Sequence, residues 1–490
     1  MEAFFYLSPQ TSPQVLFNSL DFGVFLVVVF SMYWIIGGKR RVSQNVLILI
    51  ASYIFYGLWD WRFLTLLIGS SLIDFIAARY IAASDNKSKR RFWLIFSLFW
   101  NLGILFTFKY LNFFLDSFHS FFDSNLLPGE FSIWNVIIPV GLSFYTFQTM
   151  SYSIDVYRNK CKPTHNLLNF LCYVSFFPQL VAGPIERTSF LLPQFEKNRQ
   201  FDLNEAKEGL RQILWGLFKK ILVADKLGIA VSMVFDNPEG YGFVSLCYAA
   251  ILFSFQVYCD FSGYTDIAIG TARLFGFRLH INFRLPYLAK SMTQFWQRWH
   301  ITLTKWFTDY VYLPIVKRFK KTTAWVRIWA LLLTMTLVGL WHGANWTFIC
   351  FGVFNGLLLA MERIPLGSTK KTLARILPIQ PRWFSLIYFF SLTSISSIFF
   401  RAETINDAWL ILKRIFTLAK DPQFSLLIGV KILFLLLMIA AELVTRRKEF
   451  PLQNLEAHMP KWMRWTIYYT LIVLLIRFYE PLKTFIYFQF

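Results

Sequence analysis

Apolar stretches long enough to cross a bilayer as helices, about 20 residues each, alternate with short polar and basic segments along the whole chain. This pattern predicts an all-α protein, a polytopic integral membrane helical bundle with about 11–13 membrane-embedded helices. Since no internal repeat or low-complexity linker interrupts it, residues 1–490 are predicted to form a single membrane domain. The candidate spans are 17–37, 44–59, 62–83, 92–115, 133–155, 167–184, 209–235, 243–273, 326–361, 383–400, 426–444 and 463–480.

Basic residues gather in the polar segments that follow the first, third and fifth candidate spans, at 39–41, 87–91 and 158–162. Cytoplasmic loops carry an excess of Lys and Arg, so the N-terminus is expected on the extracytoplasmic side. Another basic segment, at 446–464, precedes the last span, and the C-terminus is therefore expected on the same side. The net charge of +21 favours contact with anionic lipid rather than nucleic acid, because it lies in these loops.

At 56% hydrophobic and 20% aromatic residues, the chain has more apolar residues than a soluble globular domain needs. The five cysteines are scattered without a Cys-x-x-Cys pair, which predicts neither a metal site nor a disulfide framework. The first apolar run is preceded by Asp21 rather than a basic region, and no small-residue cleavage site follows it. We therefore expect a retained first helix rather than a signal peptide.

An ionisable residue at membrane depth is a functional-site hypothesis by default, and His342 is the leading candidate. It lies in the apolar stretch 326–361 beside Gly343, where we expect the stretch to break into two elements. A neutral imidazole at a cavity could take a proton from a hydroxyl nucleophile. The alternative is a hydrogen-bonded histidine that packs between helices.

His300 lies in a segment rich in aromatic and basic residues, 282–314. One interpretation of this segment is an interfacial helix with an aromatic belt and snorkelling cations. In the other, His300 is the second polar group of a site and orients the substrate or the base. The remaining histidines are expected to be solvated; they are His119, His165, His280 and His458.

Two carboxylates, Asp260 and Asp266, fall within the candidate span 243–273 and need partners at that depth. They could bind substrate, or they could pair with Arg273, Arg284 or a cation of another helix.

The segment 176–187 contains Pro178, Gly183 and Pro184, which predict a re-entrant turn at a cavity, or simply a loop. The chain contains neither the phosphate-binding G-x-x-x-x-G-K-[ST] nor the nucleophile elbow G-x-S-x-G.

Seven segments together resemble the membrane-bound O-acyltransferase family, and the resemblance covers nearly the whole chain. The most specific block, 282–348, contains NFRLPYLAKSMTQFWQRWHITLTKWFTDYVYLP and GLWHGANWTF. The other segments are VLFNSLDF (15–22), SYSIDVYR (151–158), PQLVAGPIER (178–187), DFSGYTDIAIG (260–270) and FRAET (400–404). The nearest branch is similar to the membrane subunits of bacterial alginate O-acetyltransferases, which are related to the D-alanyl transferases of teichoic acid.

The resemblance implies a helical core around a central funnel or tunnel, with a catalytic part at about 135–362 and C-terminal helices at 383–480. It implies that His342 is the catalytic histidine and His300 the second polar position. Acetyl-CoA would be a co-substrate, with no bound cofactor and no metal. The candidate substrate-binding residues are Trp296, Arg298, Trp299, Asn345, Asp260 and Asp266.

The family also implies partners and a location. These are an extracytoplasmic partner with a serine hydrolase-like (SGNH) domain, a polysaccharide acceptor such as alginate, and the bacterial inner membrane. Two alternatives remain for the acceptor, peptidoglycan and a lipid-linked sugar. An alternative of a different class is a transporter of a polymer or a small molecule, which would favour paired half-helices in two halves of the chain.

The C-terminal residues 485–490 form an F-x-Y-F-x-F pattern. This pattern resembles the terminal motif of the small peptide partner of the D-alanyl system, which implies that Tyr487 accepts the acyl group. The alternative is an aromatic belt at a membrane boundary. The basic run 317–321 is likewise open to two interpretations, attraction of acetyl-CoA phosphates or ordinary charge bias of a cytoplasmic loop.

Overall fold

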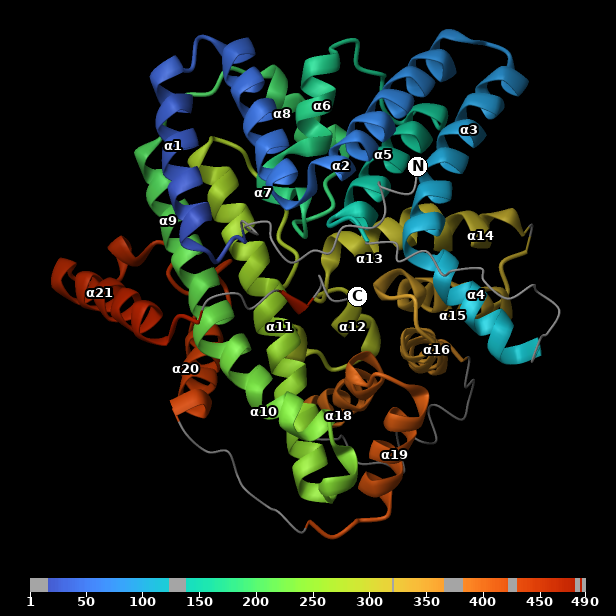
Figure 1. Ribbon diagram of the computed structural model, residues 1–490, viewed down its shortest axis with the longest axis vertical. Helices are drawn as coiled ribbons and strands as arrows, with labels where there is room; N and C mark the ends of the chain where they lie inside the picture. The colour runs from blue at the N-terminus through green and yellow to red at the C-terminus, as the bar shows by residue number, and fades with distance from the viewer. Residues whose placement is uncertain are drawn as a thin grey trace. The chain divides into compact units, whose positions relative to one another are not determined.

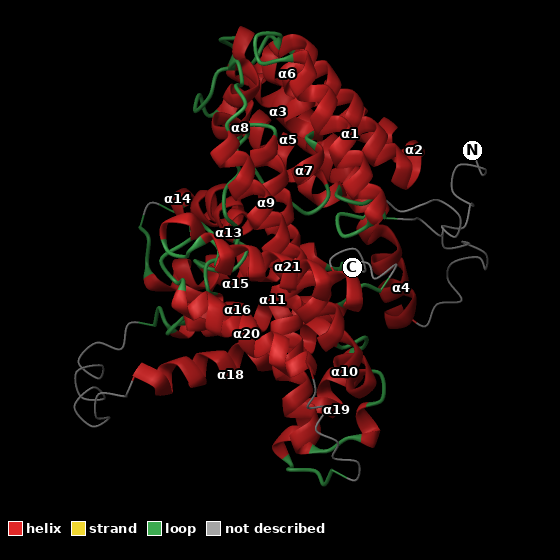
Figure 2. Ribbon diagram, turned by 90° about the vertical axis from the view of Figure 1, so that its left-hand side faces the viewer, coloured by secondary structure: helices red, strands yellow, loops and turns green. Residues whose placement is uncertain are grey.

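The computed structural model describes residues 16–122, 138–319, 321–364, 382–421, 430–480 and 485–486. These residues form helices and loops, with no strand among them (Figure 2). The all-α prediction is therefore confirmed. The longer helices are α1 Leu20–Ile36, α2 Arg41–Ala83, α3 Lys87–Leu105, α4 Leu111–Phe122, α5 Leu142–Tyr157, α9 Leu203–Leu217, α10 Asp225–Phe235, α11 Phe243–Leu274, α15 Ala324–His342, α16 Trp346–Met361, α18 Arg382–Arg401, α19 Ile405–Phe416, α20 Val430–Val444 and α21 Lys461–Phe478.

Short helices connect these elements. They are α6 Leu167–Ser175, α7 Phe177–Leu180, α8 Thr188–Glu196, α12 Met292–Trp296, α13 Ile301–Phe307 and α14 Leu313–Arg318, with π-helical stretches at Phe106–Tyr110, Phe218–Ala224 and Thr308–Tyr312. Single 3₁₀ turns lie at Pro238–Gly240, Pro286–Leu288 and Leu455–Ala457.

The chain divides into two compact units, which we call unit 1 and unit 2. Unit 1 comprises residues 1–213 and 267–280, and unit 2 comprises residues 214–266 and 281–490. Helices α9 and α11 each contribute residues to both. That the whole chain acts as one membrane domain stays a prediction.

Unit 1 is organised around α2, which packs against α3, α5 and α6 (Figure 1). Within α2, Asp60 has non-helical dihedrals (φ −161°, ψ 110°), and the helix kinks there. The kink lies where the sequence separates the candidate spans 44–59 and 62–83. Further along α2, the buried Asp74 accepts hydrogen bonds from Ser97, from Asn101 Nδ2 at 2.8 Å and from Ser153 Oγ at 2.8 Å. One carboxylate therefore joins α2, α3 and α5.

The prediction that residues 167–184 form a membrane span was wrong. Helix α6 has 9 residues and α7 has 4, and both are too short to cross a bilayer. Proline lacks the amide hydrogen and clashes with the preceding turn, so Pro178 stands in the first turn of α7 instead of continuing α6. The expected helix breaks in 176–187 are thus present, and the residues from Phe176 to Glu186 are buried.

In unit 2, helices α15 and α16 lie side by side (Figure 1). Two glycines let these helices approach. A Cβ on Gly339 would collide with the carbonyl oxygen of Phe348, and a Cβ on Gly352 with that of Met335. The prediction that 326–361 breaks into two elements is confirmed, because α15 ends at His342 and α16 begins at Trp346.

Five helical segments of the described residues are long and apolar enough to cross a membrane. They are Arg41–Ala83, Lys87–Ser120, Phe243–Leu274, Ala324–His342 and Trp383–Arg401, and the shorter Leu20–Ile36 and Trp346–Met361 are also apolar. A multi-pass membrane protein is therefore supported, while the larger predicted number of embedded helices stays a prediction.

Candidate active site

His342 is the last residue of α15, at the turn that leads into α16. Gly343 follows with extended dihedrals, and its Cβ position is occupied by the ring of Phe348, so glycine is required there. The imidazole is 4% exposed and is surrounded by aromatic rings, with ring centroids at 4.9 Å from Trp341, 5.1 Å from Phe400 and 5.8 Å from Phe351. The side chain therefore lies in a tightly packed aromatic environment.

His300 lies between α12 and α13 and is fully buried. Its backbone is left-handed (φ 42°), a conformation that costs energy for a residue with a Cβ. The interpretation of this segment as an interfacial helix is wrong for its centre, because two short helices replace one long one and Trp296, Trp299 and Trp306 are buried.

The hydrogen bond of His300 fixes its tautomer. Its Nδ1 lies 3.3 Å from Asn282 Oδ1, and the same Asn282 atom accepts the backbone N–H of Thr302 at 3.1 Å. A backbone N–H can only donate, so this Asn282 atom is the carbonyl oxygen, and His300 Nδ1 must carry the proton. Burial lowers the pKa of His300 to about 3. The ring is thus neutral at physiological pH, with Nε2 as its basic nitrogen.

In the folded protein the rings of His300 and His342 both lie beside the indole of Trp341. The ring of Trp341 lies 5.7 Å from that of His300 and 4.9 Å from that of His342. Helix α11 adds Phe261, whose ring lies 4.7 Å from His300. Two buried imidazoles beside one indole form an arrangement in which one imidazole can accept a proton and the other can position the reacting group.

Trp296 and Trp299 lie close to this centre. The indole of Trp299 stacks on Phe295 at 5.6 Å, and that of Trp296 lies 6.3 Å from Phe351, which also contacts His342. Trp296 Nε1 is buried and has no hydrogen-bond partner among the described residues. A buried donor of this kind is costly unless something accepts its hydrogen bond, and substrate binding by Trp296 and Trp299 stays a prediction.

The remaining predicted site residues lie in different settings. Arg298 is half-buried, and its carbonyl accepts the N–H of Arg284. Asn345 caps α16 by accepting the N–H of Thr347 at 3.0 Å and donates to the carbonyl of Glu403 at 2.9 Å. These contacts are structural, and a role of Arg298 or Asn345 in substrate binding stays a prediction. Tyr487 lies outside the described residues.

Asp260 and Asp266 pair with two consecutive lysines of the π-helical stretch Phe218–Ala224. Lys220 Nζ lies 2.5 Å from Asp260, and Lys219 Nζ lies 2.5 Å from Asp266. Pairing with a cation from another helix is thereby confirmed. The sequence contained the signal, since lysines within the apolar span 209–235 need carboxylate partners.

Sequence reasoning also missed three polar side chains, of which Asn282 and Glu186 are buried and Glu442 is half-buried. Asn282 orients His300, and Glu186 accepts both the backbone N–H of His280 at 2.6 Å and a hydrogen bond from the His280 ring at 2.7 Å. His280 is exposed, as expected, but it is not merely solvated. Glu442 accepts the hydroxyl of Tyr258 at 3.0 Å.

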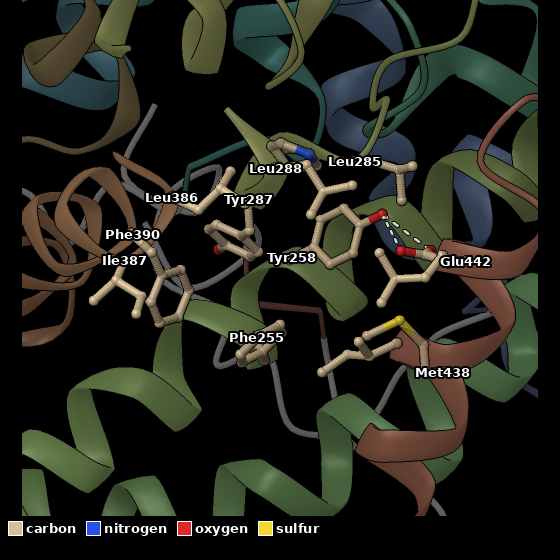
Figure 3. Close-up of a pocket in the computed structure, with 13 residues that line it drawn as sticks. Phe255, Tyr258, Leu285, Tyr287, Leu288, Leu386, Ile387, Phe390, Met438 and Glu442 are labelled. Atoms are coloured by element: carbon tan, nitrogen blue, oxygen red, sulfur yellow. Dashed lines mark hydrogen bonds between the residues drawn. The ribbon is translucent and has the colours of Figure 1, made fainter. Parts of the chain in front are cut away.

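Glu442 and Tyr258 form one side of an apolar pocket of about 270 Å³ in unit 2 (Figure 3). Figure 3 shows the Tyr258 hydroxyl directed at the Glu442 carboxylate, with Phe390 and Ile387 on the opposite side. A smaller cavity of about 40 Å³ touches Phe351 and Phe400, which both pack on His342, and Tyr287 lines both spaces. This volume admits a water or a small group. The central funnel stays a prediction.

The fold and the site together define the class of protein: a helical multi-pass membrane protein in which two buried histidines lie around a tryptophan. Comparison with known proteins then gives the family: the membrane-bound O-acyltransferase profile matches residues 75–401. This chain belongs to the membrane-bound O-acyltransferase family and is therefore an enzyme, an acyltransferase, rather than the transporter considered as an alternative.

Individual relatives support the assignment. A Pseudomonas aeruginosa protein named probable alginate O-acetylase AlgI is 37% identical over 400 residues, which cover 80% of this chain and 73% of that protein. The peptidoglycan O-acetyltransferase of Helicobacter pylori is 34% identical over 433 residues, covering 81% of this chain and 79% of that protein. The teichoic acid D-alanyltransferase of Streptococcus thermophilus is 28% identical over 251 residues, covering 48% and 59%.

Proposed function

We propose that this protein is an O-acetyltransferase of the bacterial inner membrane that moves acetyl groups from cytoplasmic acetyl-CoA toward an exported polysaccharide such as alginate. Family membership and the relatives named for O-acetylation support the chemistry. The observation that carries the proposal is the pair of buried imidazoles around Trp341. Acetyl-CoA is a co-substrate in this proposal, and the transfer requires no other cofactor.

In the proposed reaction the acceptor is Tyr487. A phenol is a poor nucleophile at neutral pH because its pKa is about 10, so it needs a base as it attacks. His342 takes the phenolic proton while the tyrosine oxygen attacks the thioester carbonyl. The carbon–sulfur bond breaks, and the imidazolium returns the proton to the CoA thiolate. His300 accepts a hydrogen bond at Nε2 and positions the reacting group.

The acetyl ester then passes to an extracytoplasmic partner with a serine hydrolase-like domain, and from there to a polysaccharide hydroxyl. Delivery requires the C-terminus outside the cytoplasm, which agrees with the basic segment at 446–464. The basic residues of 317–321 would attract the acetyl-CoA phosphates on the cytoplasmic side. A second candidate acceptor is peptidoglycan, because one relative is named for that reaction.

The test uses the purified full chain and isotope-labelled acetyl-CoA. Intact-protein and peptide mass spectrometry should find one acetyl group on the C-terminal peptide. The Tyr487→Phe variant keeps the ring and removes only the hydroxyl, so it should lack this label, as should His342→Ala. A Tyr487→Phe enzyme that still acetylates exported polysaccharide at the normal rate would show that the tail is not the carrier.

A further inference from the structure

The last described residues of the chain are held in unit 2 by α11 and the π-helical stretch before α10. The backbone N–H of Ile486 donates to Asp260 Oδ2 at 2.8 Å in a buried hydrogen bond. The neighbouring Phe485 is 1% exposed. Its ring meets Tyr264 edge-on at 4.7 Å, and Lys220 Nζ lies 4.3 Å from its centroid. Three kinds of contact therefore hold two consecutive residues.

The two carboxylate oxygens of Asp260 have different partners: one belongs to the charge cluster of Asp225, Lys220 and Asp260, and the other bonds to the C-terminal tail. Its Oδ1 pairs with Lys220, which also pairs with Asp225 at 2.9 Å, while its Oδ2 accepts the tail N–H. Hydrogen bonds to a charged acceptor are stronger than neutral ones, and a cation over an aromatic face gains most where both are desolvated. The cluster is therefore suited to hold this short peptide segment.

The local fold of unit 2 explains how the lysine reaches this position. Phe218–Ala224 is π-helical, a form that occurs mostly as single turns at functional sites. Gly263 of α11 allows the approach, because a Cβ there would come 2.8 Å from the carbonyl oxygen of Gly216. Lys220 can thus lie against Asp260 with both side chains buried.

The same turn of α11 serves the histidine site. Phe261, whose ring packs on His300, is the residue after Asp260. Fixing Ile486 on Asp260 therefore ties the tail to the helix that supports His300. Any residue after Ile486 starts one peptide bond away, about 3.8 Å between Cα atoms.

We propose that Asp260, Lys220 and Tyr264 form a receptor site for the C-terminal segment, and that docking of Phe485 and Ile486 there positions Tyr487 for acyl transfer. Docking of the tail does not depend on acyl transfer, whereas the role of docking in positioning Tyr487 rests on the function proposed above. Asp260, Lys220 and Tyr264 are positioning residues in this proposal, since they act through the tail.

The first experiment is hydrogen–deuterium exchange of the purified full chain, read on the C-terminal peptide. The Ile486 amide should exchange at least about tenfold more slowly than an unprotected amide, and Asp260→Ala should restore fast exchange. Asp260→Asn retains a carbonyl oxygen and should keep part of the protection. Asp225→Asn is the matched control, because Asp225 also pairs with Lys220 whereas the Ile486 amide donates to Asp260; it should leave the amide protected.

The second experiment separates positioning from folding by changing only the tail. Ile486→Pro removes the donated N–H, Phe485→Ala removes the ring, and Ile486→Val keeps the N–H. At saturating acetyl-CoA, the first two variants should acetylate Tyr487 at least about tenfold more slowly, with an unchanged half-saturating acetyl-CoA concentration. Ile486→Val retains the donated N–H and should therefore lose less of the acetylation rate than Ile486→Pro.

Two outcomes would overturn the proposal: an Ile486 amide that exchanges as fast in the wild type as in Asp260→Ala, or normal Tyr487 acetylation in both Phe485→Ala and Ile486→Pro. Failure of the proposed function is distinguishable. If polysaccharide acetylation proceeds in Tyr487→Phe, the carrier role is lost, while the exchange experiment still decides whether the tail docks on Asp260.

Discussion

Asp74 in unit 1 and Asp260 in unit 2 are both buried carboxylates on long apolar helices, yet they have different partners. Asp74 is held by neutral donors of neighbouring helices, Ser97, Asn101 and Ser153. Asp260 pairs with Lys220 and gives its second oxygen to the tail. The first arrangement joins helices, and the second joins a charge cluster to a terminal segment that carries proposed chemistry.

The difference has a physical basis. Burying a carboxylate is costly unless hydrogen bonds or a counter-charge replace water. The donors of Asp74 belong to two helices, α3 and α5, that pack against its own helix α2, so the network can change only if these helices separate. On the tail, the contacts with this cluster come from Phe485 and Ile486, and Asp260 pairs with Lys220 through its other oxygen. We therefore expect changes in unit 1 to reduce stability and changes at the centre of unit 2 to reduce activity.

The largest expected effect is that of His342→Ala. Loss of a general base costs about 100- to 10,000-fold in rate, and we expect acetyl transfer to fall by that amount while expression and membrane insertion stay normal. His458→Ala is the matched control, since His458 is exposed and, among the described residues, its ring bonds to the nearby carbonyl of Asn454. Near-normal transfer by a well-expressed His342→Ala protein would contradict the assignment.

His300 should be next, because its role depends on the position of the ring as well as on its basicity. We expect His300→Ala to reduce acetyl transfer by about 100-fold and His300→Asn by less, since Asn retains a hydrogen-bonding side chain. Initial rates with labelled acetyl-CoA measure both. If neither substitution changed the rate, His300 would be a packing residue only.

Asp74→Ala tests the structural half of the comparison. It leaves three buried donors without their acceptor, which should destabilise unit 1 by about 3 kcal/mol. The thermal midpoint of purified protein, followed by fluorescence-detected size exclusion, should fall, with a smaller decrease for Asp74→Asn. The surviving folded protein should keep its specific activity. A large loss of activity at an unchanged midpoint would instead assign Asp74 a functional role.

Gly339→Ala tests whether the close approach of α15 and α16 supports the turn that carries His342. The added methyl group would meet the Phe348 carbonyl and push α15 from α16, at a cost of about 1–3 kcal/mol. Because His342 is on α15, both stability and acetyl transfer should decrease. Gly69→Ala on α2 is the control, since a Cβ there meets nothing within 4 Å. Equal effects of the two substitutions would exclude the close approach as the cause.

Near neutral pH the smallest effect is a pH dependence of stability that originates in His300. Its pKa is lowered by burial from 6.5 to about 3, so between these values the unfolded chain binds a proton that the folded protein does not. Stability from this group is therefore complete above pH 6.5 and decreases as the pH falls toward 3, by up to about 1.4 kcal/mol per pH unit. Denaturation at several pH values should show a shallower slope in His300→Asn. Identical slopes would contradict the buried neutral state.

The sequence predicted the helical class, the helix break at His342 and the need of Asp260 and Asp266 for partners, with a cation as one of two alternatives. Hydropathy alone gave 167–184 as a membrane span because it averages over Pro178, although Pro178, Gly183 and Pro184 had already indicated a turn or loop in 176–187. The sequence also assigned His300 no orienting partner, although Asn282 lies in the same block. Local signals identify the histidines, but hydropathy and motif matching do not specify a hydrogen bond between side chains of different turns.

The features that the sequence determined by itself depend on residues that are neighbours along the chain. Long apolar stretches form membrane helices, and the glycine after His342 ends helix α15. The tertiary structure decided which lysine meets which carboxylate, which nitrogen of His300 is basic and where the tail lies. The partners in the tail contact are separated by 226 residues, and those in the Lys220–Asp260 pair by 40. Such pairings depend on how helices pack, because a buried charge is stable only beside the partner that packing brings to it.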